Sequence, residues 1–575
     1  MNRLFQRSQL VCGFVVCAAA LMAGQTSVLT WHNNNWRDGL NSTETVLNES
    51  NVNSGQFGKV CQAVVDGQIF AQPLVVSHGG NNTVYIATMN DSIYEINGSN
   101  CSQIAQVSLL EANEVAVPCA TVGGPQCYTV KPIIGILGTP VIDSTTNTIY
   151  LVTETESTAG TCATSKQNSC FTHRLHALDV TTLAEKFGGP INIAGSYQKI
   201  SFTSVNHIQR PGLLLLPKTW QNGDSTVYIA FSEMDGSGVV GVNIPRGWIF
   251  AFDAYNLANA PIIWSSTPGD EGGGLWMSGA GLAAGLDSPG GNTYLYVATG
   301  DGDFTVNTGG ADYGDSFVKL TTNLTTVPNG YFTPYGQACM NVADEDFGSG
   351  GVMLIPDSGS TYWAIAAGKD KNIYALNRAN PGGFTPPTNT TCPATGTNKI
   401  QEYFTASSTP FFTTAAYWNS ALFYAPIFGP LSKYEVSATA PPVCHPYPIC
   451  QNHTAKSSLS FQYGTNLSIS SSGNTNGTAI VWLSDGNTWP GKSSPSPAPV
   501  ILYAYDAQHI TSPQTIPELW DSTQCPARDQ PGNATKFAVP TVANGLVYLG
   551  TMDPTDTTNT RGELDVFGPT TAVCN

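Results

Sequence analysis

Charged side chains are scarce in this sequence, and their scarcity limits what the protein can bind. Only 11% of the 575 residues are Asp, Glu, Lys or Arg, and 40 acids against 23 bases give a formal net charge of −17. A protein that binds nucleic acid presents a basic face, so this charge argues against nucleic-acid partners. It favours cations or neutral molecules, either a small molecule or an extracellular polymer or protein.

Long hydrophobic segments are also missing, with one exception near the N-terminus. Arg3 and Arg7 precede an apolar stretch, 10–23, and polar sequence begins at Gly24. Fourteen apolar residues are too few to span a bilayer, and the pattern is typical of a signal peptide over residues 1–23. No other segment is long and apolar enough for a membrane span. We therefore expect a secreted, periplasmic or cell-surface protein.

Several signatures of catalysis are absent. The sequence has no Cys-x-x-Cys-His for an attached c-type haem, no Gly-x-Ser-x-Gly, no His-Glu-x-x-His and no phosphate-binding loop. The stretch Ser484–Trp489 is one residue short of the Asp-box of sialidase propellers, and its Asp, Gly and Asn are ordinary turn formers. No reaction follows from a local motif.

A short repeat is present instead. Its clearest copies are Leu175-His176-Ala177-Leu178-Asp179, Ile249-Phe250-Ala251-Phe252-Asp253, Ile373-Tyr374-Ala375-Leu376-Asn377 and Leu502-Tyr503-Ala504-Tyr505-Asp506. Weaker copies lie near Tyr94, Val318, Tyr434 and Val566, at intervals of roughly 60 to 80 residues, the upper end of what a four-stranded propeller blade with insertions occupies. Eight copies predict eight blades.

Each copy follows a β-branched and aromatic run such as Thr83–Thr88 or Tyr294–Thr299, bounded by turn formers, which is typical of strands. The last repeat lacks an outer strand, whereas Phe57–Val65 resembles an outer strand without a blade. We expect an all-β protein: an eight-bladed β-propeller of four-stranded antiparallel blades, forming a single domain over 24–575. The N-terminal strand closes the ring by pairing Lys59–Val65 with Leu564–Phe567, which removes exposed sheet edges.

The repeat resembles the pyrroloquinoline-quinone (PQQ) repeat of quinoprotein-alcohol-dehydrogenase-like propellers. The resemblance is closest to secreted bacterial PQQ-like propeller proteins of unassigned reaction, and it is carried by Thr30–Asn33, Gly67–Pro73, Ile136–Asp143, Arg174–Asp179, Gly274–Gly279, Tyr313–Phe317 and Val539–Gly545. It implies the propeller fold and export. For the dehydrogenases it also implies a planar quinone lying on a tryptophan, a calcium ion held by a Glu and an Asn, and an Asp base. The adjacent Cys-Cys pair of many such enzymes is absent.

Twelve cysteines remain beyond the predicted signal peptide, an even number that predicts disulfides in an exported chain. Short spacings favour the local pairs Cys119 with Cys127, Cys162 with Cys170 and Cys444 with Cys450. An alternative for the last pair is a zinc site formed by Cys444, His445, Cys450 and His453.

The topology of a propeller predicts where a site would lie. The loops between second and third strands project to the face on which the inner strands begin, and here they are long and acidic: Glu154–His173, Glu233–Arg246, Asp301–Asp315, Asp485–Pro499 and Asp553–Arg561. Oxygen-rich loops suit a hard cation, most simply calcium, and the candidate metal ligands are Glu233, Asp301, Asp303 and Asp315. The resemblance to the dehydrogenases implies Glu233 or Glu271 as the calcium-binding Glu and Asp301 or Asp303 as the base.

Around the axis on that face we expect the residues that open the inner strands. They are Gln72, Thr139, Arg210, Trp276, Ser278 and Lys536, the candidate ligand-binding residues. Trp276 is either an aromatic of the inter-blade core or the platform for a quinone.

Three functional hypotheses follow. The first is a secreted binding or structural module, because a repeat predicts shape and not chemistry. The second is a calcium- and PQQ-dependent dehydrogenase of alcohols or sugars, and the third is a carbohydrate-active propeller. Convergence of Trp276, an Arg or Lys and two carboxylates in the axial funnel would distinguish the second.

Overall fold

The computed structural model describes residues 26–574 apart from 123–129, 235–243, 358, 360, 401, 437–448, 451–454, 463–464, 487–497 and 512–513. The predicted signal peptide, residues 1–23, lies outside this part of the chain. Strands dominate, and the α-helices of the described residues are short: α1 (Cys119–Val122), α3 (Gln337–Ala343) and α4 (Pro526–Asp529). In the same residues, no helix is long and apolar enough to cross a membrane.

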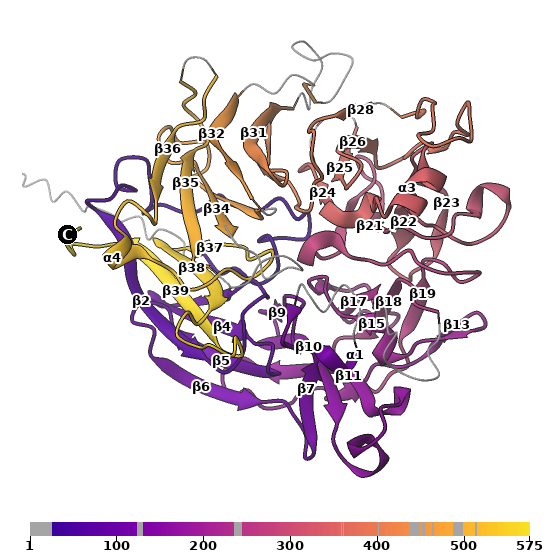
Figure 1. Cartoon of the computed structure of the whole chain (residues 1–575), viewed down its shortest axis with the longest axis horizontal. Helices are drawn as coiled ribbons and strands as arrows, with labels where there is room; N and C mark the ends of the chain where they lie inside the picture. Colours follow the sequence, from indigo (N-terminus) through magenta and orange to yellow (C-terminus); the bar gives the residue numbers. More distant parts are fainter. Residues whose placement is uncertain are drawn as a thin grey trace, which may run out of the picture.

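Eight antiparallel sheets stand around one axis, as the repeat predicts (Figure 1). From the inner strand outward, blades one to four are β3 (Leu74–His78), β4 (Asn81–Ala87), β5 (Ser92–Asn97) and β6 (Gln103–Ser108); β9 (Val141–Asp143), β10 (Thr148–Ser157), β11 (Phe171–Asp179) and β12 (Ile191–Asn192); β16 (Leu214–Leu216), β17 (Thr226–Glu233), β18 (Trp248–Asp253) and β19 (Ile262–Ser265); and β20 (Ala283–Leu286), β21 (Thr293–Ala298), β22 (Phe317–Thr321) and β23 (Thr326–Thr333).

The second half of the ring repeats this order. Blades five to eight are β24 (Val352–Leu354), β25 (Trp363–Ala367), β26 (Asn372–Asn377) and β28 (Glu402–Thr405); β29 (Ala416–Trp418), β30 (Ala421–Tyr424), β31 (Gly429–Glu435) and β32 (Ala455–Phe461); β33 (Leu467–Ser470), β34 (Ile480–Gly486), β35 (Val500–Asp506) and β36 (Glu518–Asp521); and β37 (Thr541–Ala543), β38 (Leu546–Met552), β39 (Gly562–Pro569) and β2 (Phe57–Val65). Short strands extend four of these sheets: β1 (Leu40–Asn41), β7 (Glu114–Pro118), β8 (Ile133–Ile134), β15 (His207–Ile208) and β27 (Gly383–Phe384). A separate hairpin consists of β13 (Ser196–Tyr197) and β14 (Ile200–Ser201).

The predicted closure of the ring is confirmed. The N-terminal strand β2 pairs antiparallel with β39, in a register that places Lys59 opposite Phe567 and Val65 opposite Gly562. Lys59 also forms ion pairs with Glu563 at 3.2 Å and with Asp565 at 2.5 Å. The first and last parts of the chain therefore share one blade, and the sheet of blade eight is complete only when both are in place.

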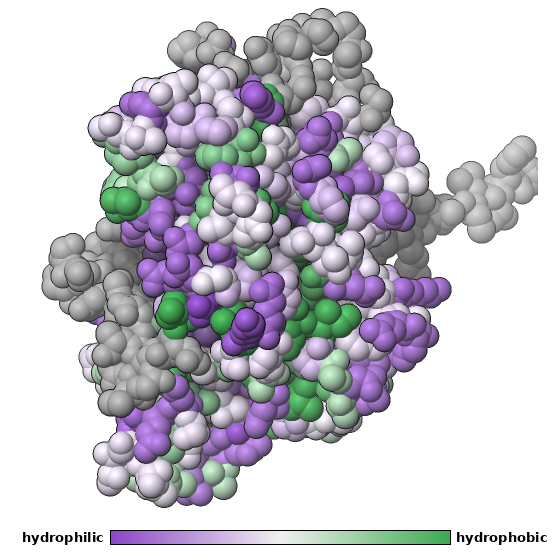
Figure 2. Space-filling view, turned by 90° about the vertical axis from the view of Figure 1, so that its right-hand side faces the viewer, coloured by the Kyte–Doolittle hydropathy of each residue, from purple (hydrophilic) through white to green (hydrophobic). Residues whose placement is uncertain are grey.

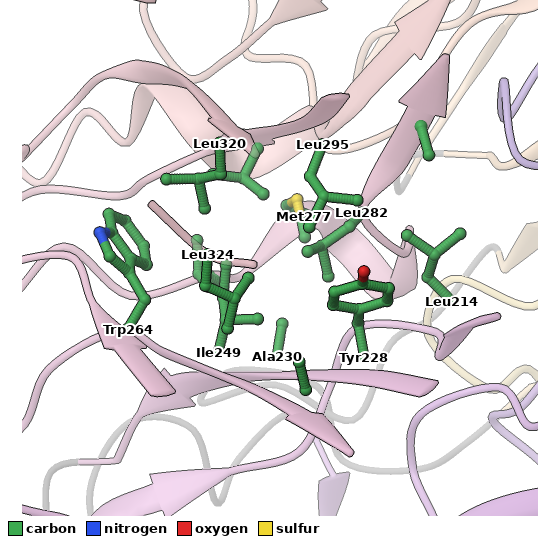
Figure 3. Packing of buried hydrophobic residues seen from close by; sticks show 14 of the residues in the cluster. Leu214, Tyr228, Ala230, Ile249, Trp264, Met277, Leu282, Leu295, Leu320 and Leu324 are labelled. Atoms are coloured by element: carbon green, nitrogen blue, oxygen red, sulfur yellow. The ribbon is translucent and has the colours of Figure 1, made fainter. Parts of the chain in front are cut away.

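The hydrophobic core lies between the blades. One cluster combines Tyr228 and Ile249 of blade three with Leu295 and Leu320 of blade four (Figure 3). The middle strands contact a neighbouring blade on each face, so they are apolar on both sides instead of alternating. On the side of the molecule that carries β13, β19 and β23, hydrophilic residues predominate and hydrophobic ones occur in small groups (Figure 2).

A non-repeating segment, residues 28–41, runs along the inner strands around the axis, and we call it the N-terminal strap. It hydrogen-bonds to the inner strand of every blade in chain order, through Val28 to Val75, Leu29 to Ile142, Asn35 to Leu215 and Ala284, Trp36 to Leu354, Asp38 to Tyr417, Gly39 to Ile469 and Asn41 to Val542. Inner strands of a ring present main-chain groups that lack a further strand to pair with. The strap pairs with some of them in all eight blades.

Arg37 holds the strap at the centre of the ring. Its guanidinium is fully buried and donates to the strap at Thr30 Oγ1 (2.8 Å) and the Trp31 carbonyl (3.0 Å), and to the blades at the carbonyls of Leu213 (3.2 Å) and Leu282 (2.9 Å). Burial lowers the pKa of Arg37 to about 9. The group therefore stays charged at neutral pH, held by oxygens and not by a carboxylate.

Disulfides are present, as the cysteine count predicts. Cys162–Cys170 is confirmed, and Cys61–Cys101, Cys339–Cys392 and Cys525–Cys574 are pairs that spacing did not predict. Cys119 and Cys450 are also disulfide-bonded. The other residues of the predicted pairs, Cys127 and Cys444, lie outside the described residues, as do His445 and His453. Because Cys450 is in a disulfide, it cannot supply the thiolate of the alternative zinc site. Four disulfides are compatible with a periplasmic or extracellular location.

Replacing Arg37 should destabilise the whole ring. In Arg37→Met four buried oxygens lose a donor, and we expect the free energy of unfolding to fall by about 3–5 kcal/mol. Urea denaturation followed by tryptophan fluorescence measures this. The control Lys199→Met removes an exposed cationic side chain that has no ion pair among the described residues, and it should change stability by less than about 0.5 kcal/mol. Equal effects of both substitutions would contradict a central role for Arg37.

The disulfides should differ in strength according to the loop that each closes. Cys61–Cys101 joins residues 40 apart in sequence and links β2 to blade one, whereas Cys162–Cys170 joins residues 8 apart. Loop-closure entropy predicts a loss of about 4 kcal/mol for the double serine variant of the first pair and of about 2.5 kcal/mol for the second. Calorimetric melting of the two variants tests this order, and a reversed order would refute it.

Candidate functional site

An axial pocket lies on the side of the strap where the inner strands begin. It is lined by Trp31, Phe70, Leu137, Thr139, Arg210, Gly279, Lys536 and Phe537. Trp31 belongs to the strap and stacks on His32, with ring centroids 3.7 Å apart. The strap thus contributes one wall of the pocket as well as its pairing with the inner strands.

Two cations lie against aromatic rings on one side of this site, which we call the basic side. The Arg210 guanidinium lies 4.7 Å from the ring centroid of Phe537 and 5.9 Å from that of Trp276. Lys536 Nζ lies 4.9 Å from the same Phe537 ring, on the segment that leads into β37. Burial and the charges of Arg210 and Lys369 lower the pKa of Lys536 to about 7.

Glu233 and Trp276 form the link to an acidic side. Glu233 ends β17, and its Oε1 accepts a hydrogen bond of 3.2 Å from Trp276 Nε1. The other oxygen, Oε2, is buried and has no hydrogen-bond donor among the described residues. Burial, reinforced by the charges of Asp301 and Asp346, raises the pKa of Glu233 well above its ordinary value. Trp276 therefore lies between the basic side and a carboxyl group that has no counterion among the described residues.

Three aspartates gather beside Glu233. Asp301, Asp344 and Asp346 each offer an oxygen within 4.8 Å of the others, and the backbone N–H of Asp301 donates to Asp346 Oδ1 at 2.9 Å. Lys369 pairs with Asp344 at 2.6 Å and with Asp346 at 2.5 Å. Burial raises the pKa of Asp301 to about 8, with Asp346 adding to the effect. We call Glu233, Asp301, Asp344 and Asp346 the acidic cluster.

Close packing at Gly300 holds the cluster against the indole. A Cβ added at Gly300 would lie 2.4 Å from Asp346 Oδ1 and 3.0 Å from Trp276 Cδ1. Any larger residue would push the carboxylate away from the ring. Trp276, two cations and several carboxylates thus occupy one axial region, which is the convergence that distinguishes the dehydrogenase hypothesis.

The other residues predicted for the site are placed differently. Gln72 is buried and hydrogen-bonds the strap at His32 N and blade eight at Thr541. Ser278 donates to the carbonyl of Ser349, and Thr139 lines the pocket. The contacts of Gln72 and Ser278 are therefore structural.

The other acidic residues of the loops do not all lie near the acidic cluster. Asp315 is fully buried near the acidic cluster, where its Oδ1 accepts from Phe347 N at 3.1 Å. Asp303 lies instead beside Asp270 and Asp312, and Glu271 is exposed. Glu154 is paired with His173 Nε2 at 3.2 Å, and both side chains are buried.

Asp344, Asp346 and Lys369 were not predicted from the sequence. Asp344 and Asp346 lie between α3 and β24, and Lys369 in the turn between β25 and β26, none of them in a copy of the repeat. The triplet Asp344-Glu345-Asp346 concentrates three acids in a chain that is poor in charge, and this pattern could have indicated the two aspartates as candidates.

Comparison with known proteins identifies the fold. No family model and no curated protein sequence matches the chain. Among solved structures it is similar to quinohemoprotein alcohol dehydrogenase from Comamonas testosteroni, with a TM-score of 0.57 at 14% identity, covering 96% of this chain and 82% of that one. A europium-containing methanol dehydrogenase gives a TM-score of 0.51 at 13% identity, covering 94% of this chain and 98% of that one. The chain therefore has the eight-bladed propeller fold of the quinoprotein alcohol dehydrogenases.

Proposed function

We propose that this propeller is a calcium- and PQQ-dependent dehydrogenase of alcohols or sugars. The observation that carries the proposal is the convergence of Trp276, Glu233, Asp301 and Asp346 beside the axial pocket. The binding-module hypothesis uses the same pocket and differs from this one in predicting no turnover.

The acidic cluster supports a cation site. Its four carboxylates are balanced among the described residues by Lys369, which pairs with two of them. Glu233 Oε2 remains buried without a donor, and the raised pKa values of Glu233 and Asp301 reflect the cost of placing these acids together. Calcium binds six to eight oxygens, mostly of carboxylates and carbonyls, so Glu233, Asp301 and Asp346 are suitable ligands.

Trp276 supports a planar cofactor. Its indole is fixed by the hydrogen bond to Glu233, so the ring is held in one orientation beside the cation site. When bound, the quinone supplies the two-electron acceptor and the cation polarises it.

A carboxylate of the acidic cluster would take the proton of the substrate hydroxyl. Asp346, which pairs with Lys369 at 2.5 Å, is the candidate for this role. Because the strap seals the inner strands behind the pocket, we infer that substrate enters from the face that carries the acidic loops.

Export from the cytoplasm belongs to the same proposal. The apolar segment that follows Arg3 and Arg7 and the disulfides both support a secreted, periplasmic or cell-surface enzyme.

Calcium affinity should rise with pH. In the metal-free protein the carboxyl group of Asp301 is protonated below a pKa of about 8. Its contribution to folding stability is fully present below its ordinary pKa and is lost as the pH rises through 8. Calcium must displace that proton, and we expect affinity to increase about tenfold per pH unit between pH 6 and 8. Isothermal titration calorimetry at several pH values measures this, and a flat profile would count against the site.

Two aspartates separated by one residue serve as matched variants in this titration. Asp301→Asn should weaken calcium binding at least tenfold and flatten the pH profile, because it removes a ligand and its proton. Asp303→Asn changes the same functional group outside the acidic cluster and should have the smaller effect. A larger effect at Asp303 would move the cation to that loop.

Turnover should appear after reconstitution with PQQ and calcium. A dye-linked assay with a panel of primary alcohols and aldoses is expected to show reduction of the dye, and Glu233→Gln and Asp346→Asn should each lower kcat by roughly 100-fold or more. Glu111→Gln, at a side chain that is 58% exposed, is the control and should retain activity. PQQ binding without turnover of any substrate would favour the binding module.

A further inference from the structure

Arg210 is a buried cation that has no anionic partner among the described residues. The residue is 8% exposed, and its guanidinium has no hydrogen bond or ion pair among the residues that the structure describes. Its contacts there are the faces of Trp276 and Phe537. A buried charge without a counterion is costly, and most buried charges in proteins are paired. Arg210 therefore lacks the partner that its burial calls for.

Lys536 increases this positive charge. Its ammonium contacts the rings of Phe412 at 5.7 Å and Phe537 at 4.9 Å, so the Phe537 ring has a cation from each of two segments. Arg210 and Lys536 line the same pocket. The charges of Arg210 and Lys536 repel each other in this poorly solvated region, and a bound anion would reduce the repulsion.

We propose that the axial pocket binds the carboxylate of a small organic anion, with Arg210 as the main binding residue and Lys536 as a second cation. A guanidinium presents two parallel donors that match the two oxygens of a carboxylate. Trp31, Phe70 and Leu137 give the pocket apolar walls, which suit an organic acid better than a hydrated inorganic ion.

The size of the pocket limits the group that enters it. It has room for about one water molecule. A carboxylate head group is of that order, so the body of the ligand would extend along Trp276 toward Glu233. A molecule with a carboxylate at one end and a hydroxyl at the other would reach both sides of the indole.

Two molecules could carry this carboxylate: a hydroxy acid that serves as substrate, or the quinone, which bears carboxylates of its own. The choice between them rests on the proposed function. The carboxylate site itself depends only on Arg210, Lys536 and the pocket.

Binding of glycolate to the metal-free, full-length protein tests the site, with ethylene glycol as its neutral counterpart. We expect calorimetry to show saturable binding of glycolate and none of ethylene glycol at the same concentrations. Arg210→Gln and Lys536→Met should weaken glycolate binding, the former roughly 10- to 100-fold, the range for losing a charge-assisted hydrogen bond. Arg561→Gln removes the same charge at an exposed site and should leave affinity unchanged.

Lys536→Met guards against misfolding of the Arg210 variant, and melting curves of both confirm that they fold. Equal affinity for glycolate and ethylene glycol, or affinity unchanged in both pocket variants, would overturn the proposal.

A second arm adds PQQ and calcium. If glycolate competes with PQQ, the carboxylate belongs to the quinone. If both bind together and glycolate is oxidised faster than ethylene glycol, it belongs to the substrate. If the protein binds glycolate but oxidises no substrate, the proposed carboxylate site is supported and the proposed dehydrogenase function is refuted.

Discussion

The four hydrogen bonds of Arg37 are the interaction on which the arrangement of the ring depends. Two of them hold the strap to itself at Thr30 and Trp31, and two fasten it to the carbonyls of Leu213 and Leu282, just before the inner strands of blades three and four. The repeats of such a ring contact only their neighbours. Without a central segment, the inner strands would present unpaired main-chain groups to the axis. The strap joins all eight blades in chain order, and it makes the ring a cooperative unit instead of a row of separate sheets.

Because the strap pairs with the inner strands at the centre of the ring, the two ends of the axis carry different residues. Trp31 reaches from the strap into the pocket, whose other walls come from residues that precede the inner strands, such as Thr139 and Arg210. Binding residues can therefore accumulate on one side, supported from behind by the strap. The rigid ring supplies position, and the segments between its strands supply chemistry.

The sequence predicts the blades because each depends on local patterning. Strand periodicity recurs eight times, and the absence of an outer strand in the last repeat correctly predicts the pairing of β2 with β39. The strap could not be predicted in this way, since its contacts join residues up to 501 positions apart and follow no repeat. Asp346 and Lys369 were missed for a similar reason: irregular segments bring them to Glu233, and only the folded ring sets that distance. Trp276 and Arg210 were predicted as candidates because both precede inner strands, and the structure places them next to each other.

Trp276 explains why opposite charges coexist at the site without neutralising each other. Glu233 hydrogen-bonds one edge of the indole, and Arg210 faces its ring, so an aromatic side chain lies where a direct ion pair would otherwise form. A direct pair would have satisfied both residues and left no need for a ligand. Kept apart by the ring, Glu233 and Arg210 do not pair with each other, and Arg210 has no ion pair among the described residues. The indole thus divides the site into an acidic side and a basic side that do not neutralise each other directly.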